Sequence, residues 1–408
     1  MVSHVPPLTF GPGAVDWQHR IDTAELRRQR AARARQVLKE RGVAAVLVAG
    51  PLACRYLTGL RGPEYTPEVW FVLFPAEGEP VVFAHAGYIR SLPDEAPWIH
   101  EWRIARAWLR GIAGTEASKH EAAKFADDVR AELQQLQLLD EPLGVAGFDR
   151  YARPALVDAG IKIIPGDDVL LDAMAVKTPE ELSCLRMAGT ITDRMWVAME
   201  RACRAGMTDG ELSSVGKSAA SSAGADSVKA GFRSGQLALE RGFKSNQFIV
   251  PGDLMYGNVC GTSYLGYRTC VYRTFTVGRE PTKQEIGWMD RLQGRLLAVI
   301  EELRPGAMSS TAAKHFPPAT EWGYADEVEV LTIEIGHGIG LNGYEQPAIN
   351  RQWSMDHPQP IKEGMVIAVE GREGIPGQGT VRLEQMVIVT KDGPQLIDRY
   401  PTGIKAIG

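Results

Sequence analysis

A helix-start signal at residues 178–181 divides this sequence into two parts with different hydrophobic patterns. The four residues read Thr-Pro-Glu-Glu, a capping box with proline at the first helical position. Before this signal, short apolar runs alternate with helical segments, which is typical of an α/β domain. After it, helices precede glycine-rich and β-branched segments, which is typical of an α+β domain. We therefore predict two domains, one covering residues 1–171 and the other residues 172–408.

The first part contains the helical and apolar segments that an α/β domain needs. A charged segment at 24–41, followed by glycine, predicts a helix, and the pattern at 119–139 predicts another. Short apolar runs bounded by turn residues predict buried strands. These runs lie at 44–49, 69–74, 80–84 and 144–147.

The second part begins with helices and continues with segments typical of strands. Apolar residues recur at helical spacing from Leu182 to Met199, and a second capping box begins at Thr208. The segment 245–279 is rich in glycine, aromatic and β-branched residues, which predicts a pair of hairpins. Residues 285–303 predict a further helix, and the chain from 328 onwards predicts strands and glycine turns. This order favours helices beside an antiparallel sheet.

The composition argues against several classes of partner and location. The chain has 408 residues and a formal net charge of -5, so no basic excess points to nucleic acid. No apolar run approaches the roughly 18 residues that a membrane span needs, and the N-terminus lacks a secretion-signal profile. We therefore expect a cytoplasmic protein with reduced thiols. The cysteines form no CxxC pattern, and four are expected in the core: Cys54, Cys184, Cys203 and Cys260.

Three pairs of motifs in the second part carry a resemblance to a known family. They are PGD at 251–253 with RTFTVG at 273–278, GHGIGL at 336–341 with YEQP at 344–347, and EGMVIAVE at 363–370 with VRLEQMVIVT at 381–390. In this order and spacing they resemble the catalytic domain shared by creatinases, prolidases, Xaa-Pro aminopeptidases and methionine aminopeptidases. The pattern YLTG at 56–59 extends the resemblance into the first part.

The resemblance implies an α+β pita-bread catalytic domain, an α/β N-terminal creatinase-like domain before it, and a homodimer. In metal-dependent members of the family, two aspartates, one histidine and two glutamates hold two metal ions. His337 matches the histidine, and Glu370 and Glu384 match the glutamates. Asn258 and Cys270 stand where the two aspartates are expected.

The replacement of both aspartates predicts that the site holds no metal. Two divalent ions carry four positive charges, and Glu370 and Glu384 would balance only half of them. Creatinase, which the chain resembles in architecture, works without metal and has asparagine at the first of these positions. The alternative is a single zinc or iron ion on His337, Glu370, Glu384 and Cys270, because a thiolate suits such a soft ion.

Without a metal, the two glutamates are expected to share a proton and to act with His337 in acid–base catalysis. We therefore predict that Glu370, Glu384 and His337 cleave a C–N bond of a small polar nitrogen-containing metabolite. The reaction class is a hydrolase, with a lyase left open. Creatine is not expected as substrate, because no histidine between 121 and 314 can match the catalytic histidine of creatinase.

Five residues are candidate substrate contacts. Arg241 lies near the position of the missing creatinase histidine, where its planar guanidinium could clamp a carboxylate. Tyr344 replaces the second histidine of the aminopeptidase motif, and its phenol could hydrogen-bond an oxyanion. Asn258 and Cys270 are expected to line the same cleft, although Cys270 could equally be a packing residue. Arg61 could reach the site of a partner subunit.

Two other functions remain open at this point. A metal-dependent Xaa-Pro-type peptidase with substituted ligands would keep the usual chemistry of the family. A non-catalytic binding protein would use the same fold for recognition alone. The presence of His337, Glu370 and Glu384 together argues against the second of these alternatives.

Overall fold

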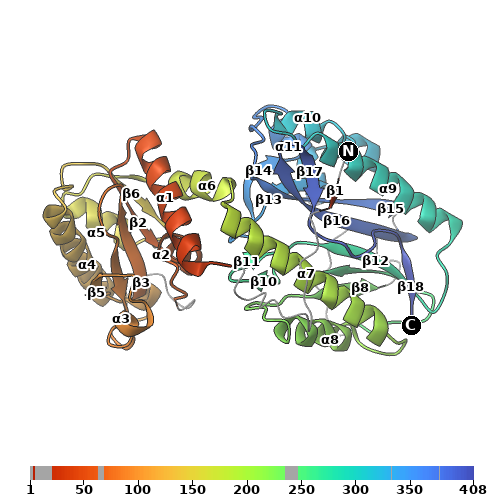
Figure 1. Ribbon diagram of the computed structural model, residues 1–408, viewed down its shortest axis with the longest axis horizontal. Helices are drawn as coiled ribbons and strands as arrows, with labels where there is room; N and C mark the ends of the chain where they lie inside the picture. The colour runs from red at the N-terminus through yellow and green to blue at the C-terminus, as the bar shows by residue number, and fades with distance from the viewer. Residues whose placement is uncertain (1–2, 5–20, 63–68, 235–246, 332, 376) are drawn as a thin grey trace. The chain divides into compact units, whose positions relative to one another are not determined.

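The structure, a computed structural model, describes residues 3–4, 21–62, 69–234, 247–331, 333–375 and 377–408 (Figure 1). Its contacts divide the chain into one unit of residues Asp22–Ala173 and another of Met174–Gly408, which also takes in the N-terminal residues. The boundary predicted between 171 and 172 lies two residues before this division. Ser3–His4 (β1) were assigned to the first domain, but they pair in parallel with β17 (Gly393–Leu396) of the second unit.

The unit Asp22–Ala173 is built on a mixed six-stranded sheet in the order β5-β4-β3-β2-β6-β7. The strands are β2 (Ala45–Ala49), β3 (Trp70–Pro75), β4 (Val81–Ala84), β5 (Glu101–Ile104), β6 (Leu143–Ala146) and β7 (Ile163–Pro165). The helices are α1 (Thr23–Arg41), α2 (Pro51–Thr58), α3 (Leu92–Glu95), α4 (Thr115–Gln135), α5 (Ala152–Asp158), α6 (Asp167–Ala175) and the short η3 (Leu109–Gly111).

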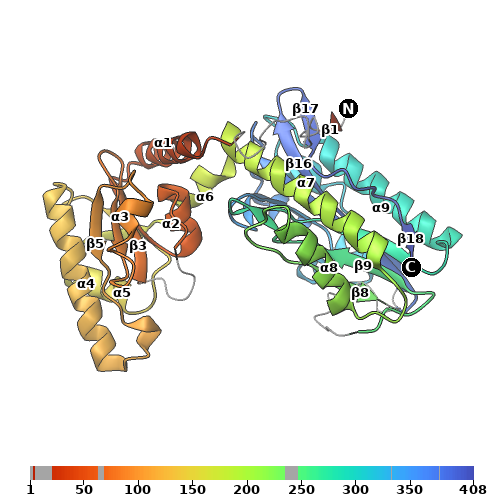
Figure 2. The ribbon, with the colours of Figure 1, turned by 60° about the horizontal axis from the view of Figure 1, so that its bottom comes forward.

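Helices lie on both sides of this sheet, with α4 and α5 on one side and α1 and α2 on the other (Figures 1 and 2). All five residues of β2 are buried, as the continuous apolar run predicted for a strand covered on both faces. The helix predicted at 24–41 is α1, which ends at Gly42 in the left-handed conformation that glycine adopts most easily.

The unit Met174–Gly408 contains a six-stranded sheet in the order β1-β17-β16-β15-β13-β14 and a four-stranded sheet in the order β18-β12-β9-β8. Its remaining strands are β8 (Gly231–Ser234), β9 (Leu254–Asn258), β10 (Ser263–Tyr264), β11 (Tyr267–Arg268), β12 (Tyr272–Val277), β13 (Ile335–Gly338), β14 (Glu345–Ile349), β15 (Val366–Ile375), β16 (Gly379–Thr390) and β18 (Lys405–Ile407). Its helices are α7 (Pro179–Ala202), α8 (Asp209–Ser221), α9 (Lys283–Glu301), α10 (Ser309–Ala313), α11 (Arg351–Ser354) and the short η4 (Ala319–Trp322) and η5 (Glu327–Val330).

The three long helices of this unit all begin at a threonine with a complete capping box. The boxes at Thr178 and Thr208 were predicted, and Thr282 begins α9 in the same way. In each box the threonine side chain accepts from the backbone N–H three residues later, which satisfies a donor left open at the helix start. These signals fix where each helix begins, whatever it packs against.

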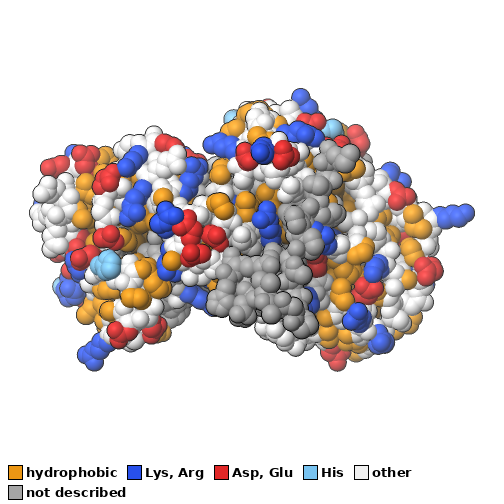
Figure 3. All heavy atoms as spheres, in the orientation of Figure 1, with side chains coloured by type: hydrophobic (Ala, Val, Ile, Leu, Met, Phe, Trp, Pro, Cys, Tyr) orange, Lys and Arg blue, Asp and Glu red, His pale blue; other side chains and the backbone are white. Residues whose placement is uncertain are grey.

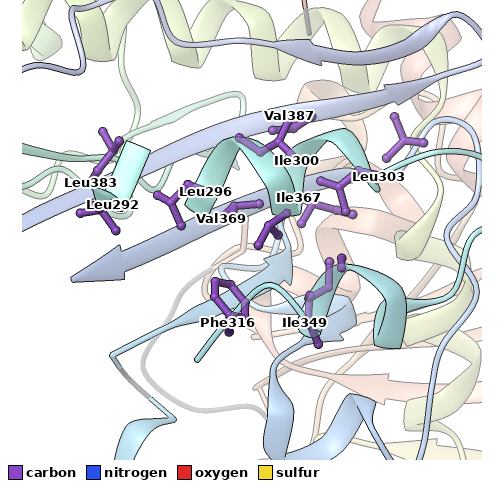
Figure 4. Close-up of a cluster of buried hydrophobic side chains, with 14 of the residues drawn as sticks. Leu292, Leu296, Ile300, Leu303, Phe316, Ile349, Ile367, Val369, Leu383 and Val387 are labelled. Atoms are coloured by element: carbon purple, nitrogen blue, oxygen red, sulfur yellow. The ribbon is translucent and has the colours of Figure 1, made fainter. Parts of the chain in front are cut away.

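The core of this unit lies between α9 and the sheet strands β15 and β16 (Figure 4). Leu292, Leu296 and Ile300 recur on one face of α9, and they meet Val369 and Leu383 from the strands. Burying each such side chain stabilises the fold by about 1.5–3 kcal/mol. This packing holds rigid the two strands that carry the glutamates of the candidate site.

The described surface is mixed in character. On the face shown in Figure 3, acidic and basic side chains are interspersed and hydrophobic side chains lie scattered among them. Within the described ranges, no helix is both long enough and apolar enough to cross a membrane.

Candidate active site

Three neighbouring strands of the six-stranded sheet bring His337, Glu370 and Glu384 to one face. Glu370 on β15 pairs with Glu384 on β16, and it also pairs with Ile335 on β13. His337 lies two residues after Ile335, so its side chain points to the same face. The three side chains predicted to be catalytic are all buried, with relative exposures of 2%, 1% and 0%.

The imidazole of His337 is held in a fixed orientation. Its Nδ1 lies 3.0 Å from the carbonyl oxygen of Gly338, which assigns the proton of the neutral ring to Nδ1. Nε2 is then the basic nitrogen, and it lies 3.8 Å from Oε1 of Glu384. A basic nitrogen facing a carboxylate oxygen at this separation suits a proton or a cation held between them.

Glu370 has a basic partner on the neighbouring strand. Its Oε2 forms a close ion pair with Nη2 of Arg382, and both side chains are 1% exposed. The Arg382 guanidinium also lies 3.7 Å from the ring centroid of Tyr272, a favourable cation–π contact. Arg382 therefore places a positive charge beside Glu370, a partner that the sequence analysis did not include when it expected the two glutamates to share a proton.

Asn258, at the first aspartate position, is engaged within its own hairpin. Its amide nitrogen donates to the Tyr272 hydroxyl at 2.5 Å, and its side-chain oxygen accepts from the backbone N–H of Cys260 at 3.1 Å. Both polar atoms of the side chain thus hold the loop that joins β9 to β12. Asn258 thus shapes the hairpin beside the site, and its predicted contact with substrate remains a prediction.

Cys260 and Cys270 face each other across that loop and are joined by a disulfide bond. The Sγ atom of Cys260 lies 3.4 Å from Oε2 of Glu384. In the disulfide this sulfur carries no hydrogen, so the approach becomes a hydrogen bond only after reduction. The prediction that Cys260 is a core residue with a reduced thiol is therefore wrong. The three remaining cysteines are buried and free, as predicted: Cys54, Cys184 and Cys203.

Of the other predicted substrate contacts, the structure places Tyr344 at the site. Its ring centroid lies 4.4 Å from that of His337, and the residue is 58% exposed, so it stands where the buried group meets solvent. Arg61 is an exposed residue of the unit Asp22–Ala173. Arg241 lies outside the described residues.

Two arginines that support the site were missed in the sequence. Arg382 stands two residues before Glu384 on one strand, so period-two alternation places both on one face. Arg273, fully buried, donates to the backbone carbonyl of Glu384 at 2.7 Å and to the carboxylate of Asp398 at 2.5 Å. Arg273 thereby locks the strand that carries Glu384, and its position at the start of the RTFTVG motif was the available signal.

The described residues contain one group of at least three histidine, cysteine or acidic side chains with ligand atoms close enough for a metal. It consists of Cys260, Cys270 and Glu384, whose ligand atoms lie within 4.8 Å of one another. Two sulfurs and a carboxylate form a soft, zinc-like donor set, unlike the oxygen-rich sets that hold hard ions. Once the Cys260–Cys270 disulfide is reduced, these residues fit one soft cation, and they do not fit a pair of hard cations.

An imidazole and two carboxylates on one face of such a sheet, preceded by an α/β unit, define a two-domain hydrolase with the pita-bread fold. Solved structures share this fold. Dipeptidase PepE from Mycobacterium ulcerans superposes with a TM-score of 0.74 at 22% identity, covering 95% of this chain and 99% of that one. Zinc-substituted aminopeptidase P of E. coli in complex with product gives 0.68 at 19% identity, covering 94% and 96%.

The chain belongs to metallopeptidase family M24, whose sequence model matches residues 183–391. It is 29% identical to the Xaa-Pro dipeptidase of Pyrococcus furiosus over 242 residues, which is 57% of this chain and 66% of that protein, just under two thirds. It is 26% identical to the probable dipeptidase PepE of Mycobacterium tuberculosis over 388 residues, covering 93% and 96%.

These comparisons confirm the family, the fold and the reaction class, since a metallopeptidase is a hydrolase. They also correct the prediction that the site works without metal. The family is one of metallopeptidases, and the aminopeptidase P in the comparison is a zinc-substituted protein. The sequence analysis considered the residues at the usual ligand positions, including Cys270, and it did not consider the thiol of Cys260.

Proposed function

We propose that this chain is a metal-dependent hydrolase of dipeptide-like substrates with proline at the second position. The observation that carries the proposal is the cluster of Cys260, Cys270 and Glu384 beside His337, within the segment that matches the metallopeptidase family. Relatives named Xaa-Pro dipeptidase and probable dipeptidase support the substrate class.

A cation bound at this cluster would polarise the scissile carbonyl and make water a stronger nucleophile at neutral pH. The side chains then have separate tasks. His337, oriented by the Gly338 carbonyl, can take a proton at Nε2. Glu370 is held charged and fixed by Arg382, where it can orient the leaving amine. Tyr344, half in solvent, can donate its hydroxyl hydrogen to a substrate carbonyl.

The test is proline release from a panel of dipeptides by reduced protein loaded with zinc, manganese or cobalt. We expect hydrolysis of Xaa-Pro dipeptides and little hydrolysis of matched Xaa-Ala dipeptides. Glu384→Gln should lower turnover by about 10²–10⁴, the usual contribution of a positioned acid, base or ligand. A reduced, metal-loaded protein that hydrolyses no member of the panel would contradict the proposal.

The substrate carboxylate and the oligomeric state follow from the sequence alone. Arg241 as a carboxylate clamp, Arg61 as a contribution from a partner subunit, and a cytoplasmic homodimer all remain predictions from the sequence. The Arg241 clamp can be examined with the same dipeptide panel, because loss of a carboxylate contact raises the Michaelis constant for a free dipeptide more than for its C-terminal amide.

A further inference from the structure

We propose that reduced Cys260 and Cys270 form, with Glu384, a binding site for a single zinc-class cation. While the two cysteines form a disulfide, this site cannot bind the cation. The inference rests on the proposed metal-dependent function and specifies which side chains serve it. It places one sulfur ligand, Cys270, at a position where the family usually has an aspartate, and a second, Cys260, opposite it in the hairpin. It also makes the capacity to bind metal depend on the redox state of one hairpin.

The geometry of the hairpin keeps the two sulfurs at the site in either redox state. Backbone hydrogen bonds join Val259 to Val271 (2.9 Å) and Gly261 to Thr269 (2.7 Å), so Cys260 and Cys270 stand directly opposite each other. Their Cα atoms are 3.9 Å apart. The position of the thiols is thus set by the backbone of the loop, and it does not require the bond between them.

The distances to Glu384 fit coordination of one ion. Zinc binds sulfur at about 2.3 Å and oxygen at about 2.0–2.2 Å, so a sulfur and an oxygen on one ion lie at most roughly 4.5 Å apart. The Sγ of Cys260 lies 3.4 Å from Oε2 of Glu384, and all three ligand atoms lie within 4.8 Å of one another. Small side-chain rotations are enough to bring them around a common centre.

The charge of the set also suits a divalent soft ion. Two thiolates and one carboxylate carry three negative charges, which exceed the two positive charges of the cation. Glu370 does not add to this count, because Arg382 is paired with it. Sulfur ligands favour zinc or ferrous iron over manganese or magnesium, which prefer oxygen. Three protein ligands leave a fourth position for water or substrate. His337, which is not one of the three, has its Nε2 3.8 Å from Oε1 of Glu384.

The bridged and the metal-binding states exclude each other. Two sulfurs held tetrahedrally at about 2.3 Å from zinc lie roughly 3.8 Å apart, whereas bonded sulfurs lie about 2.05 Å apart. The sulfurs of a disulfide have also lost the thiolate charge that binds metal. Closing the bridge therefore removes two of the three ligands at once.

The redox step is thiol–disulfide exchange with a small-molecule disulfide as oxidant. The thiolate of one cysteine attacks that disulfide, forms a mixed disulfide and releases one small thiolate. The second cysteine then attacks the protein sulfur, forms the Cys260–Cys270 bond and releases the other small thiolate. Two electrons pass to the oxidant, and a dithiol reverses both steps. Two cysteine thiols that start protonated release two protons.

The test measures metal binding with no substrate present, in the full-length protein. Reduced protein and protein oxidised with glutathione disulfide are each equilibrated with zinc, freed of excess metal and assayed for zinc by elemental analysis. Thiols are counted after denaturation. We expect stoichiometric zinc with five reactive thiols in the reduced protein, and little zinc with three in the oxidised protein, because Cys54, Cys184 and Cys203 stay free.

Variants separate ligation from folding. Cys270→Ala should lose zinc, whereas Cys203→Ala, which removes a buried thiol outside the cluster, should keep it. Glu384→Gln keeps both thiols and can still form the bridge, yet its zinc dissociation constant should rise by at least about 100-fold, since changes further from a metal already cost 10–100-fold. Cobalt in the reduced wild-type protein should show a sulfur-to-cobalt charge-transfer band that Cys270→Ala lacks.

Equal zinc content in the reduced and oxidised proteins would overturn this inference, and so would stoichiometric zinc in a folded Cys270→Ala variant. Either result would remove the thiol ligands from the proposed function, while peptide hydrolysis itself is decided separately by the dipeptide panel. Conversely, zinc bound as described in a protein that cleaves no Xaa-Pro dipeptide would contradict the proposed function and leave the metal site standing.

Discussion

At the scale of single residues, Glu384 connects the candidate site to the fold around it. Its carboxylate lies 3.4 Å from the sulfur of Cys260 and 3.8 Å from Nε2 of His337, and its backbone carbonyl accepts from Arg273 at 2.7 Å. A fully buried carboxylate is costly unless hydrogen bonds or positive charge compensate it. The cation in the proposed function would add such a charge to the contacts that this side chain makes in the fold.

Removal of Arg382 should show how strongly the buried ion pair with Glu370 is coupled. Arg382→Met is expected to lower the free energy of unfolding by about 3–5 kcal/mol, because it removes the guanidinium that balances a buried carboxylate. The double variant Glu370→Gln/Arg382→Met removes both charges and should recover most of that loss. Urea denaturation measures all three proteins.

A control for this cycle is Arg291→Met, which removes an arginine whose side chain is 58% exposed in its pair with Glu373. Such exposed pairs contribute about 0–1 kcal/mol, so this variant should unfold close to the wild-type midpoint. If Arg382→Met unfolds as Arg291→Met does, the buried pair is not the coupled unit described above.

At the scale of elements, local sequence signals predict where a helix or strand forms better than they predict which side chains of a hairpin face each other. The capping box at Thr178 and the apolar run of β2 are local signals, and both elements form where they were predicted. The partners of Cys260 depend on hairpin register, where a shift of one residue changes which side chains face each other. That is why Cys260 was assigned to the core.

The attachment of helix α7 to the end of the chain should make stability depend on pH. Asp193 on α7 accepts from the backbone N–H groups of Arg399 and Tyr400, each at 3.0 Å. Burial, and then the charge of Asp398, raises the pKa of Asp193 from the ordinary 3.8 to about 6. The folded protein therefore keeps a proton that the unfolded chain loses between these values. This contribution to stability is full below about pH 4 and is lost as the pH rises through 6.

Asp193→Asn tests this pH dependence, because its amide oxygen can still accept both N–H groups and cannot ionise. Relative to the wild type, the variant should gain on the order of 1–3 kcal/mol in free energy of unfolding between pH 4 and pH 7. Chemical denaturation at several pH values gives the difference directly. A difference that stays constant over this range would mean that Asp193 does not titrate as described.

At the scale of the whole molecule, the sequence predicts the architecture better than it predicts the chemistry of the site. The motifs around His337, Glu370 and Glu384 are local, and they were sufficient to indicate the family and the fold. The pairing of Ser3–His4 with β17 is a contact between the two ends of the second unit that no local pattern signals.

The prediction of a metal-free site was wrong, and it counted as sulfur ligand only Cys270, in the alternative of a single ion. Cys260 is ten residues from Cys270 in sequence, and only the folded hairpin brings it beside Glu384. The pairing of Arg382 with Glu370 likewise depends on a diagonal contact between two strands. Charge balance at a buried site therefore has to be counted in three dimensions.

The most direct test of the central claim is X-ray absorption spectroscopy at the zinc edge of the reduced, zinc-loaded protein. We expect two sulfur neighbours at about 2.3 Å and oxygen neighbours at about 2.0–2.2 Å around a single ion, the distances of thiolate ligands and of carboxylate or water oxygens. This result would place the ion on Cys260, Cys270 and Glu384. A shell made only of oxygen and nitrogen neighbours, or a second metal close to the first, would contradict a single site with sulfur ligands.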